Sequence, residues 1–160
     1  MKKITIESHL EVYDDQSSLP DAISYLMNEA IAARERAYAP YSNFHVGAAL
    51  VLENGKIISG NNQENAAYPS GLCAERTAIY YAGAQHPGVT ITAMAITAKA
   101  QDKPTTNPIP PCGACRQAIA EYEIKQKTPI AIYFMGASGQ VFKSDSIENL
   151  LPLLFTADYL

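Results

Sequence analysis

The feature that most constrains this chain is its set of three cysteines, whose arrangement indicates a metal site. Cys73 stands alone, and Cys112 and Cys115 form a Cys-x-x-Cys pair directly after a proline. Apolar residues follow each stretch at helical spacing, so each is predicted to begin a helix. A thiol at a helix N-terminus has a lowered pKa and ionises readily. Three thiolates can hold one Zn²⁺ in three of its tetrahedral positions and leave the last position for water.

A carboxylate beside the first cysteine suggests what such a site does. Glu75 follows Cys73 by two residues, which on a helix places it beside the open face of the metal rather than on the metal. Water on zinc loses its proton easily, and a nearby carboxylate can carry that proton elsewhere. A solvated acidic residue in a first helical turn is the simpler interpretation of Glu75. Its position two residues after the first predicted metal ligand favours the second interpretation, in which the site is hydrolytic and Glu75 is the catalytic group.

A closed structural zinc site, or merely three small buried hydrophobic residues, is the competing interpretation of the cysteines. Structural sites have four protein ligands, and the chain has no further cysteine. A histidine could supply the missing ligand, and the candidates are His9, His45 and His86. His45 is the nearest by topology, but it neighbours Phe44 on a predicted strand and should point to the opposite face. An open site with three ligands is therefore favoured.

The pattern resembles that of the zinc deaminases, in which a first ligand, a Glu two residues later and a Pro-Cys-x-x-Cys stretch form the site. Within these enzymes the chain is similar to the small homotetrameric cytidine deaminases, over residues 41 to 155. The motifs that carry the resemblance are Tyr41-Ser42-Asn43-Phe44-His45-Val46-Gly47-Ala48-Ala49, Asn62-Gln63-Glu64-Asn65-Ala66, Cys73-Ala74-Glu75-Arg76 and Pro111-Cys112-Gly113-Ala114-Cys115-Arg116-Gln117. Cysteine rather than histidine as the first ligand resembles the tetramers that act on free nucleosides more than the polynucleotide and tRNA editors.

The resemblance implies hydrolytic deamination of cytidine and deoxycytidine to uridine and deoxyuridine, with one Zn²⁺ per chain and Glu75 as proton shuttle. Asn62 and Glu64 would hold the ribose hydroxyls, since an amide and a carboxylate suit paired donor and acceptor contacts. Phe44 would pack on the pyrimidine ring. The other substrate-binding residues that the resemblance implies are Tyr41, Tyr68, Ala74 through its backbone N–H, and Phe155.

Arg76 and Phe155 have roles that depend on their surroundings. Three thiolates on one zinc ion leave a net negative cluster, and a guanidinium beside them offsets that charge, so Arg76 is predicted to support the ligands. Phe155 matches a C-terminal Phe that reaches into a neighbouring subunit's site. The resemblance thus implies a homotetramer with shared active sites.

Helices alternate with strands along the chain, which predicts an α/β fold with three α/β/α layers. The resemblance adds a mixed five-stranded sheet flanked by helices. Residues 1–160 are expected to form one domain with an N-terminal arm over residues 1–18, in which 3–12 form a short strand or an extended arm. The predicted helices cover 21 to about 39, 74–84, 113–122 and a short stretch ending at 151. The predicted strands cover 46–52, 56–60, 89–99, 130–135 and 140–143.

The composition and charge of the chain limit the kinds of molecule and the compartment that suit it. The net charge is −4 with no basic run, which disfavours a nucleic acid polymer and suits a small neutral nucleoside. No stretch is apolar enough for a membrane helix, and the N-terminus lacks a signal-peptide core. Three unpaired cysteines are natural as metal thiolates in the cytoplasm. Two alternatives stay open: a deaminase of nucleoside antibiotics of the blasticidin type, and a zinc-stabilised binding module without chemistry.

Overall fold

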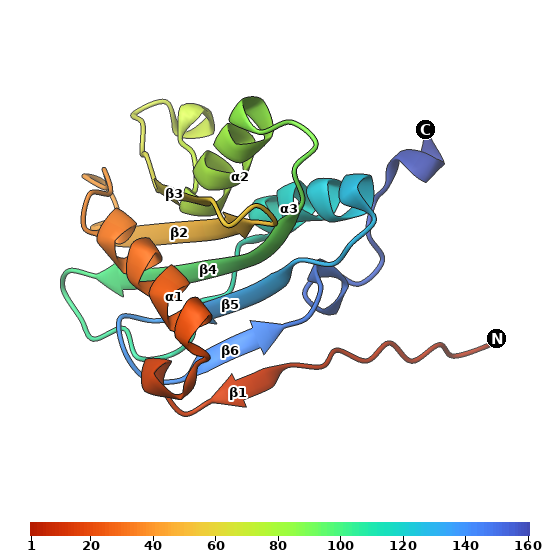
Figure 1. Ribbon diagram of the computed structural model, residues 1–160, viewed down its shortest axis with the longest axis horizontal. Helices are drawn as coiled ribbons and strands as arrows, with labels where there is room; N and C mark the ends of the chain where they lie inside the picture. Colours follow the sequence, from red (N-terminus) through yellow and green to blue (C-terminus); the bar gives the residue numbers. More distant parts are fainter.

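The computed structural model describes residues 1–160, and its centre is one mixed six-stranded sheet (Figure 1). The strand order is β1-β6-β5-β4-β2-β3, and only β4 and β5 run parallel. The strands are β1 (Glu11–Tyr13), β2 (Phe44–Leu52), β3 (Ile57–Asn61), β4 (Ile91–Ala100), β5 (Ala131–Met135) and β6 (Val141–Ser144). The α-helices are α1 (Asp21–Arg34), α2 (Ala74–Gln85) and α3 (Gly113–Gln126). None of the helices combines the length and the apolar character that crossing a membrane requires.

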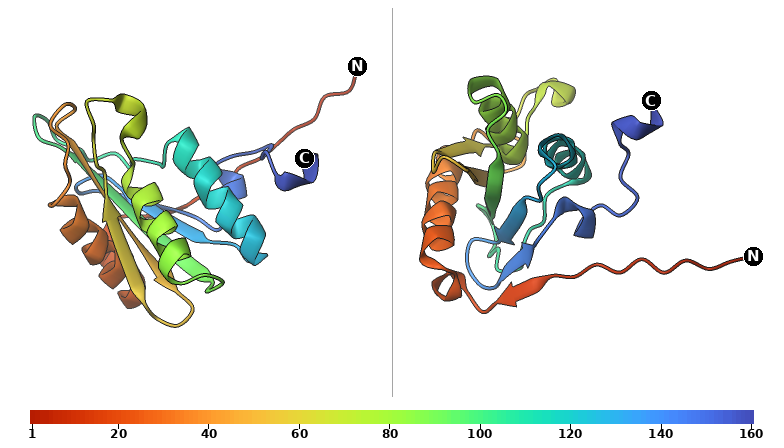
Figure 2. Two further views of the ribbon diagram at one scale, coloured as in Figure 1. Left: turned by 90° about the horizontal axis from the view of Figure 1, so that it is seen from above. Right: turned by 45° about the vertical axis from the view of Figure 1, so that its right-hand side comes forward.

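Helices cover both faces of the sheet: α1 lies on one face, and α2 and α3 lie on the other (Figure 2). Successive residues of β2 serve the two sides, as the alternation of a strand requires. Ala49 belongs to the core beneath α1 with Met27, whereas Leu50 belongs to the core beneath α2 and α3 with Ile79 and Ile119. The predicted three-layer α/β/α fold is confirmed.

A glycine on β3 sets how closely α2 approaches the sheet. A Cβ atom on Gly60 would lie 2.7 Å from the carbonyl oxygen of Ala74 and 2.7 Å from the backbone nitrogen of Ala78. These distances are shorter than any ordinary contact with a Cβ atom, so only glycine lets the first turn of α2 lie this near the strand. That turn carries Glu75 and follows Cys73.

The N-terminal arm supplies the sheet with one strand more than predicted. β1 pairs antiparallel with β6, and Glu11 lies opposite Lys143. Of the two forms predicted for residues 3–12, a short strand or an extended arm, the structure shows an extended arm over residues 1–10 that leads into the three-residue strand β1.

Two predicted helices are shorter than expected. The first helix ends at Arg34 instead of near residue 39, because Tyr38 forms a β-bridge with Gln63 and donates its backbone N–H to the carbonyl of Asn62. The last predicted helix is only a 3₁₀ turn over Ile147–Asn149, which is capped by the side chain of Ser146 accepting the N–H of Glu148.

Candidate metal centre and substrate pocket

The N-termini of α2 and α3 lie side by side and bring the three cysteines together. Cys73 is the N-cap of α2, Cys112 is the N-cap of α3, and Cys115 lies in the first turn of α3. The Sγ atoms of Cys73 and Cys112 are 3.9 Å apart, and those of Cys112 and Cys115 are 3.4 Å apart. All three sulfurs lie within 4.8 Å of one another and form no disulfide.

The electrostatics of the three thiols favour a cation between them. A hydrogen bond from Cys115, helped by the guanidinium of Arg76, lowers the pKa of Cys73 to about 5 despite partial burial. The same hydrogen bond, together with burial, raises the pKa of the Cys115 thiol. Without a metal, the interaction that favours ionisation of the Cys73 thiol therefore disfavours ionisation of the Cys115 thiol. A soft divalent ion removes that conflict, and sulfur ligands at this spacing fit Zn²⁺.

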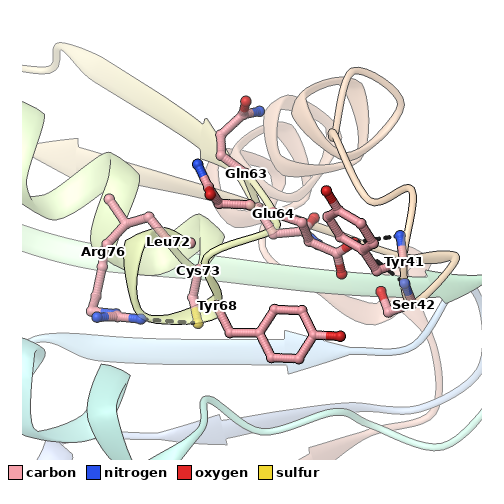
Figure 3. Close-up of a pocket in the computed structure, with 11 residues that line it drawn as sticks. Tyr41, Ser42, Gln63, Glu64, Tyr68, Leu72, Cys73 and Arg76 are labelled. Carbon is pink, nitrogen blue, oxygen red and sulfur yellow. Dashed lines mark hydrogen bonds between the residues drawn. The ribbon is translucent and has the colours of Figure 1, made fainter.

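Arg76 lies one turn into α2 and faces the sulfurs. Its Nη2 donates a hydrogen bond to the Sγ of Cys73 at 3.5 Å, drawn in Figure 3. Its Nε is buried without a hydrogen-bond partner. The guanidinium thus has donor capacity left for sulfurs that carry more negative charge, which again fits a thiolate-bound metal.

Glu75 is the one carboxylate buried next to the sulfurs. It lies in the first turn of α2 and is only 4% exposed. Burial raises its pKa, and the negative charge of Cys73 adds to the rise. A carboxyl group in this position therefore keeps its proton to a higher pH than a solvated glutamate does.

A pocket of about 470 Å³ opens in front of Cys73. This volume suits a ligand of nucleoside size. Its walls come from the loop before β2, the segment after β3 and the start of α2, as Figure 3 shows. The lining residues are Tyr41, Ser42, Asn62, Gln63, Glu64, Asn65, Tyr68, Gly71, Leu72, Cys73 and Arg76.

The two predicted ribose-binding residues line this pocket and also tie it together. The Oε2 of Glu64 accepts the backbone N–H of Tyr41 at 2.8 Å and that of Ser42 at 3.3 Å (Figure 3). Partial burial raises the pKa of Glu64, but the hydrogen bonds from Ser42 and Tyr41 outweigh it, and the net pKa is lowered. The amide of Asn62 accepts the N–H of Val46 at 2.8 Å and donates to the carbonyl of Phe44 at 2.9 Å. Both side chains therefore fix the chain around residues 41–46.

The structure does not bring every predicted residue to the pocket wall. Phe44 is half-buried on β2, and Ala74 is fully buried under the first turn of α2, and neither lines the pocket. Tyr41 and Tyr68 do line it, with their rings 6.2 Å apart. Phe155 lies in the C-terminal segment, 58% exposed and stacked on Tyr159.

The sequence did not predict the hydrogen bonds that hold the segment around Cys112 and Cys115 in place. Arg116 donates through Nε to the carbonyl of Pro111 at 2.8 Å and through Nη1 to the carbonyl of Leu150. Gln117, to which no role was assigned, donates to the carbonyl of Phe155 at 2.9 Å. The available signal was the position of Arg116 directly after Cys115, which mirrors the close sequence spacing of Cys73 and Arg76.

Comparison with known protein families shows to which family this chain belongs. Residues 20–130 match the family model described as the cytidine and deoxycytidylate deaminase zinc-binding region. The chain belongs to this deaminase family. Two curated relatives agree. The cytidine deaminase of Halalkalibacterium halodurans is 42% identical over 133 residues, which are 83% of this chain and 93% of the relative. The cytidine deaminase of Sporosarcina psychrophila is 40% identical over 137 residues, which are 85% of this chain and 93% of the relative.

Solved deaminase structures share the fold. The crystal structure of cytidine deaminase from Burkholderia pseudomallei is similar with a TM-score of 0.71 and 44% identity, covering 82% of this chain and 97% of that one. That of cytidine deaminase from Mycobacterium tuberculosis has a TM-score of 0.64 and 28% identity, covering 84% of this chain and 97% of that one. The zinc-binding character of the family agrees with the three-cysteine group described above.

Proposed function

We propose that this chain hydrolyses the C4 amino group of cytidine and deoxycytidine, giving uridine or deoxyuridine and ammonia. The observation that carries the proposal is a group of three sulfurs next to a buried carboxylate, with one of the three cysteines, Cys73, in the wall of a pocket of nucleoside size. The cytidine deaminases to which the chain is similar support the choice of substrate.

Cys73, Cys112 and Cys115 would hold one Zn²⁺ per chain. Zinc bound by three protein ligands supplies a position for water and lowers the pKa of that water toward neutrality. The guanidinium of Arg76 offsets the negative charge of the thiolates, and Arg116 braces the loop that precedes Cys112.

Glu75 moves protons between water and substrate. Its carboxylate accepts a proton from the attacking water and gives it to N3 of the cytosine ring while oxygen adds to C4. The second proton of the water then reaches the amino nitrogen through the same carboxylate, and the C4–N bond breaks to release ammonia. The raised pKa of Glu75 favours this work, because a carboxylate with a higher pKa accepts a proton more readily than a solvated glutamate does.

The remaining site residues bind the nucleoside in this proposal. Glu64 and Asn62 are assigned to the ribose hydroxyls; both line the pocket, and their hydrogen bonds to the backbone of residues 41–46 hold their side chains in fixed orientations, which supports the assignment. Phe44 is assigned to the pyrimidine ring and the backbone N–H of Ala74 to the base edge. Tyr41 and Tyr68 close the outer wall of the pocket.

We also assign Phe155 to the site of a neighbouring subunit, in a cytoplasmic homotetramer with shared active sites. Its ring is exposed and does not line the pocket of its own chain, which supports this assignment. Residues 1–160 are proposed to form one domain, in which residues 1–18 are an N-terminal arm.

The test compares substrates on protein with a measured zinc content. Loss of the cytidine absorbance band with release of one ammonia per nucleoside is the expected result, at a rate well above that with blasticidin. A faster reaction with blasticidin would assign the site to the antibiotic. If the protein bound one zinc ion per chain but released no ammonia from either compound, the chain would be a zinc-stabilised binding module without catalytic activity.

A further inference from the structure

We infer that the N-terminal arm is a self-complementary strand that pairs antiparallel with the arm of a second copy of this chain. Residues 1–10 lead into β1 and project from the body (Figure 1). β1 is the edge strand of the sheet and has β6 on one side only. An edge strand with free backbone groups is a template for pairing with another chain. The arm lies outside the residues 20–130 that match the deaminase family model, so the inference does not depend on the proposed activity.

The arm has one apolar face that nothing in the chain fully covers. Between residues 2 and 12 the apolar residues all have even numbers, so in an extended chain they share a face. They are Ile4, 88% exposed, Ile6, 51%, Leu10, 40%, and Val12, 52%. Only Ile6 among them lines the groove formed with the C-terminal segment. An alternating strand of this kind is typical of a half-buried surface, and here the burial requires a partner.

The backbone groups of the even residues point to the free edge. The N–H of His9 donates to the Oδ1 of Asn149 at 3.2 Å, so this odd residue faces the body of the protein. Successive residues of a strand direct their N–H and C=O groups to opposite edges. Ser8 and its even-numbered neighbours therefore present unpaired donors and acceptors outward.

One register makes two copies of the arm complementary. With Ser8 opposite Ser8 on a two-fold axis, Ile6 lies opposite Leu10 and Glu7 lies opposite His9. In the same register Ile4 lies opposite Val12. Sliding the pairing by one step toward the N-terminus puts Glu7 opposite Glu7, and sliding it the other way puts Glu7 opposite Glu11. Only the first register matches apolar with apolar residues while keeping like charges apart.

The same register also agrees with the backbone direction. In it the even residues form the hydrogen-bonded pairs, which are the residues whose N–H and C=O groups face outward. A second copy is therefore the occupant that fits the arm, because the complement of this strand is the strand itself read in the opposite direction. Such a contact is isologous and would join two six-stranded sheets into one continuous sheet.

Disulfide trapping in the zinc-loaded protein tests the register. Hydrogen-bonded antiparallel partners have Cα atoms about 5.5 Å apart, which lies within the range of roughly 4.4–6.8 Å that a disulfide spans. Ser8→Cys should therefore form a covalent dimer under mild oxidation. Thr5→Cys is the matched control in the same exposed arm. Its thiols would be six residues out of register, about 20 Å apart, and should cross-link at least tenfold more slowly.

A third variant separates pairing from chance collision of exposed thiols. Ile6→Lys in the Ser8→Cys protein places a charge opposite Leu10 and should reduce the rate of cross-linking to that of the Thr5→Cys control. The unsubstituted protein measures any reaction of the native cysteines. Equal rates for Ser8→Cys and Thr5→Cys, or an Ile6→Lys variant that cross-links as fast as its parent, would overturn the inference.

Discussion

Replacing Gly60 by alanine tests whether the close approach of α2 to β3 positions the reacting groups. The added Cβ atom would lie 2.7 Å from the carbonyl oxygen of Ala74 and from the nitrogen of Ala78, and 3.0 Å from the Cβ of Thr77. All three neighbours are backbone or stiff side-chain atoms, so the helix itself has to move by several tenths of an ångström or more.

The size of the effect follows from that clash. Overpacking of this kind costs about 1–3 kcal/mol of unfolding free energy. A displacement approaching 1 Å at reacting groups can lower a rate by about 10²-fold. Because the shifted turn carries Glu75 and follows Cys73, we expect Gly60→Ala to lower kcat/KM for cytidine by about 10–100-fold and to weaken zinc binding.

Gly55→Ala is the matched control for this experiment. Gly55 lies in the β2–β3 turn with φ +81°, and a Cβ atom added to it would have no neighbour within 4 Å, so alanine there introduces backbone strain only. A left-handed conformation costs about 1–2 kcal/mol, a similar loss of stability far from the site. Thermal unfolding, zinc titration and steady-state kinetics compare the two variants. If Gly60→Ala retained the rate and zinc affinity of Gly55→Ala, the positioning role of Gly60 would be refuted.

Three further predictions concern the metal, a buried carboxylate and pH. Cys112→Ala should release zinc and lower the melting temperature, because ligand binding also stabilises the fold; unchanged zinc content and melting would contradict this. Glu123→Ala should lower the unfolding free energy by about 2–4 kcal/mol in urea titrations. The substitution removes the acceptor for the N–H groups of Ile130 and Ile147 and for the hydroxyl of Ser146. A loss below about 0.5 kcal/mol, which is ordinary for a surface site, would refute this structural role. In metal-free protein the raised pKa of Glu75 means that the fold loses stability as pH rises above the ordinary value of 4.5, so the melting temperature of Glu75→Gln should gain on that of the unsubstituted protein as pH rises from 4.5; a difference that does not change with pH would contradict the raised pKa.

Local patterns predicted the parts of the fold that depend on short stretches of sequence. The helix starts at Cys73 and Cys112 follow from helical spacing, and the strands predicted over 46–52 and 56–60 correspond to β2 and β3. The alternation of helices with strands was sufficient for the three-layer arrangement.

Contacts between segments that are far apart in the sequence explain the features of the fold that local patterns did not predict. The sixth strand exists because β1 meets β6, which lies about 130 residues later in the chain. Helix α1 stops at Arg34 because Tyr38 pairs with Gln63, a contact that no local pattern reveals. The resemblance implied that Asn62 and Glu64 bind the ribose, but not that the amide of Asn62 would bind the backbone of β2.

The most direct test of the proposed chemistry is the rate of ammonia release from cytidine by Glu75→Ala, measured on protein whose zinc content has been counted. We predict about one zinc ion per chain, an intact fold and a rate lower by at least about 10²–10⁴-fold, the contribution of a positioned acid–base group. A variant that binds zinc and still deaminates cytidine at nearly the unsubstituted rate would contradict the role of Glu75.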